Sequence, residues 1–550
     1  MFATLCLIAS GLILYVGRGT FLWADDWDFM LGRFGLSPDT ILAPHAYHLV
    51  GTDVLLYELL RATAGWHFGA YRVAMVLLQV ALAVCVFIFA RRRLGGWGAT
   101  VLAGPVLFVP GHATLWFSVA SSVASLVAGM SAILVLERAQ AQRGRDIVVC
   151  ALLLLSVFSF SLGVAFALAI GVWLAVAPAT RRRLWVAAVP IVAYLAWRVG
   201  YSSNDQLTLE NLADTPQFVA DSAAAGVATL TGLGIAWGRL IALVGAIGIG
   251  YELATRRSLR TAETYALISL PLATWALIGL GRSATGPNGP TFGVGTEFAD
   301  YVTQRFAQLN QSYSAAQSRY VYASVVFIVL LAAQLLVSRG GTRAVWLGAA
   351  VLLCGVVTNA IVMRDAGTTI RTVSDAVRGR LAAVELAAGT PHAAITANRF
   401  PGGVPATSLF LGHFDEAGFN HAVRVVGSEP VPLRVLRSLG PGAGQALDAT
   451  LTAIVRPRLE AMPASPPRAA GCRVMHRHDW VAVGPANASI RTSGSPASVF
   501  VRRFAPSTAS VQVGEVPPRM VRHLTIPRDR SQKPWLMRVV SSGSVALCSS

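Results

Sequence analysis

Three carboxylates crowd the string FLWADDWDFM at residues 21–30, directly after the apolar run that begins at Met1. Only 27 of the 550 residues are acidic, yet Asp25, Asp26 and Asp28 fall almost side by side. One Asp at a helix start caps free N–H groups and complements the helix dipole, whereas three such groups repel one another. The cluster therefore predicts a compensating cation, a metal site or a catalytic use rather than capping alone.

Two histidines follow in the same loop, within APHAYHLVGTDVLLYELL. The stretch from Leu49 to Leu60 fits an amphipathic helix lying along a membrane interface. Beside the aspartates, His45 and His48 predict a phosphate or metal site. Either histidine alone is as readily an ordinary interfacial polar residue.

The composition identifies the class of protein to which these residues belong. Hydrophobic residues make up 54% of the chain and charged residues 13%, and the mean hydropathy is +0.57. Soluble domains carry about 25% charged residues, so we expect a multispanning membrane protein. The net charge of +18 comes almost wholly from arginines, with Lys533 the single lysine. These arginines lie largely between apolar runs, which argues against a nucleic-acid partner and for membrane lipids.

About eleven apolar segments are long enough to cross, or nearly cross, a bilayer core of about 30 Å. The expected spans are 2–20, 71–90, 97–111, 116–136, 147–161, 163–179, 184–199, 225–254, 264–281, 320–338 and 344–363.

Arginine clusters indicate how these spans are oriented. They fall in every second connection: Arg91–Arg93, Arg138–Arg145, Arg181–Arg183, Arg256–Arg260 and Arg339–Arg343. The positive-inside rule makes these connections cytoplasmic. We therefore expect a multi-pass plasma-membrane protein with a cytoplasmic N-terminus and outward loops at 21–70, 199–224 and 282–319. The first span is expected to be retained, because it lacks the basic start and cleavage site of a signal peptide.

From Arg364 the character of the chain changes, so we expect two domains, 1–363 and 364–550. A helix at about 366–388 leads into a mainly β outward domain with a Pro-rich turn region at MPASPPRAAG. Strands are predicted at ASVFVRRF, SVQVGEV and LMRVVSSGSVALC. Cys472 and Cys548 are the only cysteines of this domain, and an oxidising compartment favours a disulfide between them.

Further cations and aromatic residues stand at the outward ends of spans. Arg282 ends the span at LIGLGR, and Arg319 opens the next one in QSRYVY, followed by Tyr320. Arginine binds phosphate oxygens in a bidentate manner. The alternative is that these arginines reach to lipid headgroups and that the tyrosine belongs to the aromatic belt.

These features together resemble the GT-C superfamily of glycosyltransferases that use polyprenyl-phosphate sugars. The shared features are an acidic pair beyond the first span, a His-containing first outward loop, many spans and an outward C-terminal domain. The segment from Tyr71 to Arg138 is similar to bacterial relatives of protein O-mannosyltransferases, with a basic turn and then Pro110, His112 and Trp116.

The resemblance implies a sugar transfer with inversion on the outer face, from a polyprenyl-phosphate donor to a glycan, lipid or protein acceptor of the cell envelope. Asp25 or Asp26 is then the general base. Asp28, His45, His48, His112, Trp116, Arg282, Arg319 and Tyr320 are expected to bind substrate. A divalent cation, Mg²⁺ or Mn²⁺, held by Asp25 and Asp26 is a further use of the pair.

Other classes of protein fit the same general pattern. A flippase or transporter of lipid-linked sugars would place ionisable groups near the middle of the membrane, whereas the apolar segments here are nearly free of them. A non-catalytic scaffold of the cell envelope would work through its C-terminal domain. An enzyme similar to O-antigen ligase would rely on outward Arg and His residues instead of the acid pair.

Overall fold

The chain divides into two compact units, Met1–Thr369 and Ile370–Ser550. The structure is a computed structural model, and the two units are described separately. It describes residues 1–22, 25–45, 48–109, 115, 117–138, 143–201, 208–282, 318–336, 342–387, 416–427, 441–461, 472–475, 479–483, 488–506 and 508–549. Most of the outward loop 282–319 and the Pro-rich region 462–471 therefore lie outside the described residues.

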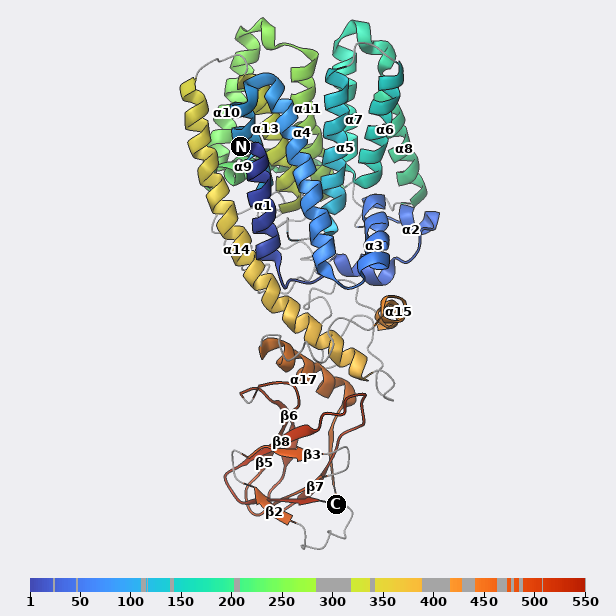
Figure 1. Cartoon of the computed structure of the whole chain (residues 1–550), viewed down its shortest axis with the longest axis vertical. Helices are drawn as coiled ribbons and strands as arrows, with labels where there is room; N and C mark the ends of the chain where they lie inside the picture. The colour runs from blue at the N-terminus through green and yellow to red at the C-terminus, as the bar shows by residue number, and fades with distance from the viewer. Residues whose placement is uncertain are drawn as a thin grey trace. The chain divides into compact units, whose positions relative to one another are not determined.

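The first unit is helical, and its long helices run side by side (Figure 1). Its described elements are α1 (Phe2–Gly17), η1 (Asp28–Gly32), α2 (Pro38–Leu42), α3 (Gly51–Ala64), α4 (Phe68–Ala103), η2 (Pro105–Leu107), η4 (Phe117–Val119), α5 (Ala120–Glu137), α6 (Arg143–Ser159), α7 (Leu162–Val176), η5 (Pro178–Arg183), α8 (Trp185–Tyr201), α9 (Leu209–Thr231), α10 (Ile235–Thr255), η6 (Arg257–Leu259), α11 (Ala262–Arg282) and α13 (Ser318–Leu336). The helix α14 (Thr342–Ala387) begins in this unit and ends in the second.

Several of these helices are apolar enough for a membrane. Among the described residues, 5 helical stretches are both long and apolar enough to cross one: Phe68–Leu107, Phe117–Glu137, Ile235–Thr255, Ala262–Gly281 and Gly348–Ala387. The shorter apolar helices are Phe2–Gly17, Leu162–Val176, Trp185–Tyr201 and Tyr320–Leu336. The structure thus has several apolar helices, as a membrane protein requires, while the predicted count of about eleven spans goes beyond what helix length and composition support.

Hydropathy alone misses one break between helices and misplaces one loop. The predicted span 225–254 is two helices, α9 and α10, because Gly232 and Gly234 take positive φ angles of 71° and 83° between them. Such angles cost little only for glycine, and Gly232 ends α9 in the left-handed conformation typical of a helix C-terminus. The predicted loop 199–224 is correspondingly wrong, since α9 begins at Leu209.

The predicted spans 71–90 and 97–111 both lie largely within α4, and the break expected between them is present, because the backbone leaves the helical conformation at Gly95 with a φ of 73°. Another pair of predicted segments is joined instead. The predicted span 344–363 and the helix at 366–388 form one continuous helix, α14. The arginine-rich turns η5 and η6 lie at the same end of the bundle, opposite the end that carries α2 and α3 (Figure 1).

After the end of α14, the described residues of the second unit form two helices and two antiparallel sheets, so its predicted β character is present. The helices are α15 (Glu416–Val426) and α17 (Pro441–Val455). The strands are β1 (Arg458–Ala461), β2 (Cys472–Met475), β3 (Val481–Val483), β4 (Ala488–Thr492), β5 (Ala497–Arg502), β6 (Val511–Val516), β7 (Val521–Thr525), β8 (Trp535–Ser541) and β9 (Val545–Ser549). One sheet has the order β1-β7-β4-β9-β2 and the other β3-β8-β5-β6.

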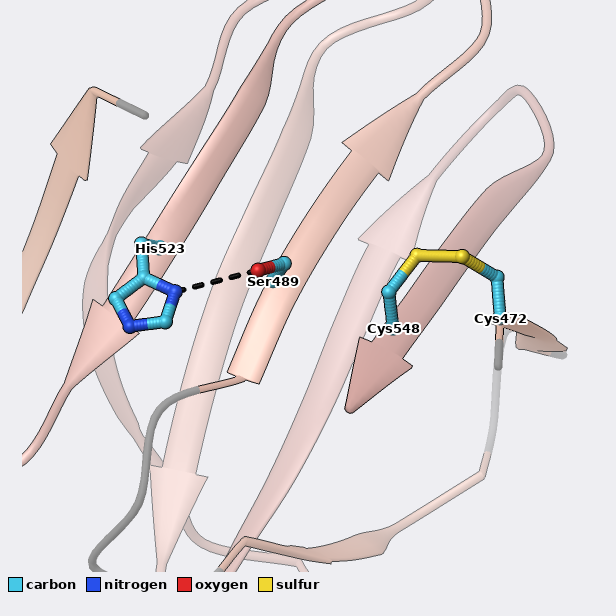
Figure 2. Close-up of a disulfide and its surroundings, with 4 residues drawn as sticks. All are labelled: Cys472, Ser489, His523 and Cys548. Carbon is cyan, nitrogen blue, oxygen red and sulfur yellow. Dashed lines mark hydrogen bonds between the residues drawn. A yellow bond between two sulfur atoms is a disulfide. The ribbon is translucent and has the colours of Figure 1, made fainter. Parts of the chain in front are cut away.

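Strands β5, β6, β8 and β9 match the three predicted strand strings, and β5 alternates buried and half-buried positions as a strand with one core face should. Cys472 on β2 lies opposite Cys548 on β9, and the two form a disulfide, which is the pairing that the sequence suggests. Figure 2 shows this disulfide beside Ser489, whose hydroxyl shares a hydrogen bond of 3.2 Å with His523 Nδ1. The disulfide thus joins the edge strand of this sheet to its neighbour.

Candidate active site

The loop between α1 and α4 brings the acid cluster and both histidines together. Asp28 begins the short π-helix η1, and His45 Nδ1 lies 2.8 Å from its carboxylate. The Arg33 guanidinium donates to the same carboxylate at 3.3 Å and to the backbone carbonyls of Ala43 and Pro44, both at 2.9 Å. Arg33 therefore fixes the chain just before His45 and supplies the compensating cation that the acid cluster predicts.

Asp25 is the accessible carboxylate of this group. Its side chain is 45% exposed, against 15% for His45, and the nearest oxygen lies 3.5 Å from His45 Nε2. Burial alone lowers the pKa of His45, but its hydrogen bonds and charge interactions with Asp25 and Asp28 outweigh burial and raise the pKa to about 9. The imidazole is therefore protonated at neutral pH, which favours the ionised form of Asp25.

Asp26 has the opposite environment, although it is the next residue in the chain. It is fully buried, and one carboxylate oxygen accepts hydrogen bonds from the Tyr57 hydroxyl and, at 2.9 Å, from the Ser118 N–H. Ser118 belongs to η4, which leads into α5. Asp26 thus ties the first loop to α3 and to the start of α5.

A fourth carboxylate, which the sequence did not single out, makes a similar connection. Asp53 on α3 accepts a hydrogen bond of 2.8 Å from the Ser121 N–H, and its own N–H donates to the Ser121 hydroxyl at 3.0 Å. Because Ser121 stands in the first turn of α5, Asp53 caps that helix from another segment. Burial raises the pKa of Asp53 to about 8, against the lowering effect of the Ser121 hydrogen bonds.

His48 contacts another part of the helical unit. Its Nδ1 lies 2.7 Å from the Ser161 hydroxyl, and its ring packs on Phe160 with 4.3 Å between ring centres. His48 and Ser161 line a cavity of about 310 Å³, together with Tyr194 and Arg198 from α8, Tyr320 from α13 and apolar side chains of α7 and α11. Tyr194 and Arg198 share a hydrogen bond one helical turn apart.

The two histidines connect the acid cluster to this cavity. His45 and His48 exchange two backbone hydrogen bonds of 2.9 Å, as opposite residues of an antiparallel bridge do. Such a pair has its Cα atoms about 5.5 Å apart. The half-exposed Asp25, which lies beside His45, is therefore connected through one short bridge to the cavity that His48 lines.

The remaining predicted site residues are described only in part. Tyr320 is buried and lines the cavity. Arg282 and Arg319 lie at the end of α11 and near the start of α13, and their side chains lie outside what the structure describes. Pro110, His112 and Trp116 also lie outside the described residues.

The fit of a divalent cation to the acid pair is poor. Asp26 already accepts two hydrogen bonds, and the protonated His45 beside Asp25 would repel a cation. In the described part of the chain, no group of three or more His, Cys, Asp and Glu side chains is arranged to hold a metal ion.

Besides Asp53, sequence reasoning missed Arg198, Arg33 and Tyr57. Arg198 carries the same signal that singled out Arg282, a basic residue near the outward end of a span, and it was detectable in that way. Arg33 and Tyr57 carry no such signal, because only the folded loop brings them to the aspartates.

Comparisons with known proteins leave the family of this chain open. No protein-family model matches the sequence, and neither a curated protein nor a solved structure is significantly similar to it.

Proposed function

We propose that this protein is a membrane glycosyltransferase of the GT-C type, which moves a sugar from a polyprenyl-phosphate donor to an acceptor of the cell envelope with inversion. The observation that carries the proposal is the position of Asp25: a half-exposed carboxylate, ionised beside a protonated histidine and separated from a cavity by one bridge. A general base must be within reach of the acceptor hydroxyl and deprotonated, and a neighbouring cation favours the deprotonated form of a carboxylate.

In this proposal Asp25 accepts the proton of the acceptor hydroxyl. The hydroxyl oxygen then forms its bond to the anomeric carbon of the sugar as the bond from that carbon to the lipid phosphate breaks. A general base of this kind contributes about 10²–10⁴ in rate. Because Asp26 is buried and doubly hydrogen-bonded, it acts here as a positioning residue and Asp25 alone as the base.

The leaving phosphate gathers negative charge, which requires cations nearby. Arg198 lies on the cavity wall, and the positive charge of His45 lies beyond the bridge. The apolar walls supplied by Leu162, Leu277 and Ile278 suit the first part of a lipid chain. No step requires a metal.

The proposal also includes an orientation. If the end of the bundle that carries η5 and η6 is cytoplasmic, as their arginines favour, Asp25 and the cavity belong to the outer face, where lipid-linked sugars are used. The C-terminal unit then lies outside the cell, and many crossings beyond the five long apolar helices are part of the same proposal.

The test is complementation of a deletion strain. Membranes from cells that lack the gene are expected to accumulate a lipid-linked sugar and to lose the matching envelope glycan. The wild-type gene should reverse both changes. The Asp25→Asn variant should reverse neither, while the protein reaches the membrane at the wild-type level.

Asp39→Asn is the matched control, because Asp39 is an exposed carboxylate in the same loop, in the first turn of α2. This variant should complement fully. Full complementation by Asp25→Asn would contradict the assignment of Asp25 as the general base. Unchanged lipid-linked sugars in the deletion strain would contradict the proposed sugar transfer itself.

A further inference from the structure

The outer face of the four-stranded sheet carries an unusual group of side chains. Strands β5 and β8 turn Val499, Val501 and Met537 to the core, and alternation places Phe500, Arg502 and Arg538 on the other face. Trp480 directly precedes β3, the neighbour of β8. We call Trp480, Phe500, Arg502 and Arg538 the Trp480 cluster, and all of its members are half-buried.

Both arginines of the cluster stack on the same indole ring. The guanidinium carbon of Arg502 lies 4.4 Å from the Trp480 ring centre, and that of Arg538 lies 4.9 Å from it. Arg538 also lies 5.6 Å from the Phe500 ring centre. Stacking of this kind holds each planar guanidinium flat and leaves its N–H edges to bind a ligand.

The cluster has no negative partner within the described part of the chain. Neither Arg502 nor Arg538 forms an ion pair there, whereas the neighbouring Arg503 pairs with Asp529 at 2.6 Å. The Nε atoms of Arg502 and Arg538 are buried and have no hydrogen-bond partner among the described residues. Arg502 donates instead through Nη1, to the Ala505 carbonyl at 3.2 Å.

Electrostatics therefore requires a counter-charge at this position. Two guanidinium groups that share one ring repel each other, and buried donors without a partner are unfavourable. One oxyanion between the two guanidinium edges would relieve the repulsion and accept from both Nε–H groups.

We propose that the Trp480 cluster is a binding site for a ligand oxyanion, a phosphate or a carboxylate group, held between Arg502 and Arg538. A membrane surface is disfavoured as the partner, because no member of the cluster is among the exposed large hydrophobic residues of the chain. The site is independent of Asp25 and of sugar transfer.

Calorimetric titration of the full-length protein in detergent tests this site. Inorganic pyrophosphate supplies the phosphate group, glucuronate the carboxylate, and glucose is the neutral control. The wild type is expected to bind at least one of the two anions and not glucose, and the preferred anion identifies the chemical source. Arg538→Gln and Arg502→Gln should each weaken binding by about tenfold or more, since each removes charge-assisted hydrogen bonds.

Arg538→Lys separates a role of the guanidinium fork from one of charge alone, and it should retain weaker binding than the wild type. Arg491→Gln is the matched control, because Arg491 is an exposed arginine on β4 of the other sheet. It should bind as the wild type does. Failure of the wild type to bind either anion, or binding that persists in the Arg502→Gln/Arg538→Gln double variant, would overturn the proposal. Binding is compared only among variants that keep the wild-type melting temperature. If a glutamine variant does not fold, Trp480→Phe replaces it: this variant keeps an aromatic ring in place and should weaken binding.

Discussion

Adjacent carboxylates in this protein have different environments and therefore different chemistry. Asp25 is 45% exposed at its side chain, whereas Asp26 is fully buried under the Tyr57 hydroxyl and the Ser118 N–H. The sequence predicted a compensating cation, a metal or a catalytic use for the acid cluster, and the cations Arg33 and His45 both contact Asp28. Which aspartate faces solvent depends on contacts made by α3 and η4, and no local pattern encodes it.

Tyr57→Phe tests the anchoring of Asp26. The phenol pKa of Tyr57 is raised by burial and by Asp26, so this hydroxyl remains a donor. Its removal leaves a buried carboxylate with one donor fewer, and the expected loss of stability is about 1–3 kcal/mol. Thermal unfolding of the purified protein measures it. Tyr251→Phe, at a tyrosine that is 67% exposed, should leave the melting temperature unchanged. Equal melting of both variants would contradict the anchoring role.

The pH dependence of stability follows from Asp53. Its pKa is about 8 in the folded protein and 3.8 in the unfolded chain, so the folded state holds the proton more tightly. The contribution of Asp53 to the free energy of unfolding is complete below the unfolded pKa and is lost as pH rises from about 4 to about 8. His45 adds a further loss of stability between pH 6.5 and about pH 9, because its pKa is also higher in the folded protein.

Melting temperatures measured between pH 4 and pH 6 test the Asp53 effect by comparison of variants, because burial also raises the pKa of Asp448 and this second carboxyl contributes to the decline in every variant. Asp53→Asn should flatten the decline over this interval, whereas Asp39→Asn should retain the wild-type slope. A slope that is unchanged in Asp53→Asn would show that another group causes it.

At the scale of the helices, the sequence predicted where helices form better than where one helix ends and the next begins. The long apolar runs became helices, but the break at Gly232 and Gly234 lies inside one continuous apolar stretch. Hydropathy does not register backbone conformation, so it predicts one span where the structure has two helices. In α14 the reverse occurred, because the change to polar composition near Arg364 does not interrupt the helix.

Glycine at the start of α7 should be indispensable. A Cβ at Gly163 would overlap the backbone of Ser156 and Val157 in α6, where no side chain can move aside. Gly163→Ala should therefore lower stability strongly, by about 1–3 kcal/mol or more, as overpacking does. Gly171→Ala on the same helix is the control, since its Cβ would meet Ala187 Cβ at an ordinary 3.5 Å. Comparable yields and melting temperatures for the two variants would contradict this packing.

At the scale of the whole molecule, the division into a helical unit and a mainly β unit was predictable, because composition changes near the boundary. Alternating strings predicted β5, β6, β8 and β9, and compartment chemistry predicted the disulfide. The Trp480 cluster was not predictable, since Trp480, Arg502 and Arg538 come from three strands or strand ends whose neighbours are set by sheet order.

Loss of the disulfide should affect one unit only. Cys472 and Cys548 are 76 residues apart, and closing a loop of that size stabilises a fold by roughly 4 kcal/mol at most. In the double serine variant, hydrogen exchange should accelerate in the strands of 472–549 and not in α4 or α5. Cys354→Ser, at an exposed free cysteine of the helical unit, should leave exchange in the strands unchanged. Uniform acceleration in both units would contradict their independence.

The most direct measurement is consumption of the donor by purified protein. Lipid extract from the deletion strain supplies the lipid-linked sugars, and mass spectrometry follows their conversion to free polyprenyl phosphate in proteoliposomes with the envelope acceptor. Wild type and Asp39→Asn should consume one lipid-linked sugar at the same rate, and Asp25→Asn should be slower by about 10²-fold or more. No consumption by the wild type, or equal consumption by Asp25→Asn, would contradict the assignment of Asp25 as the base of a sugar transfer.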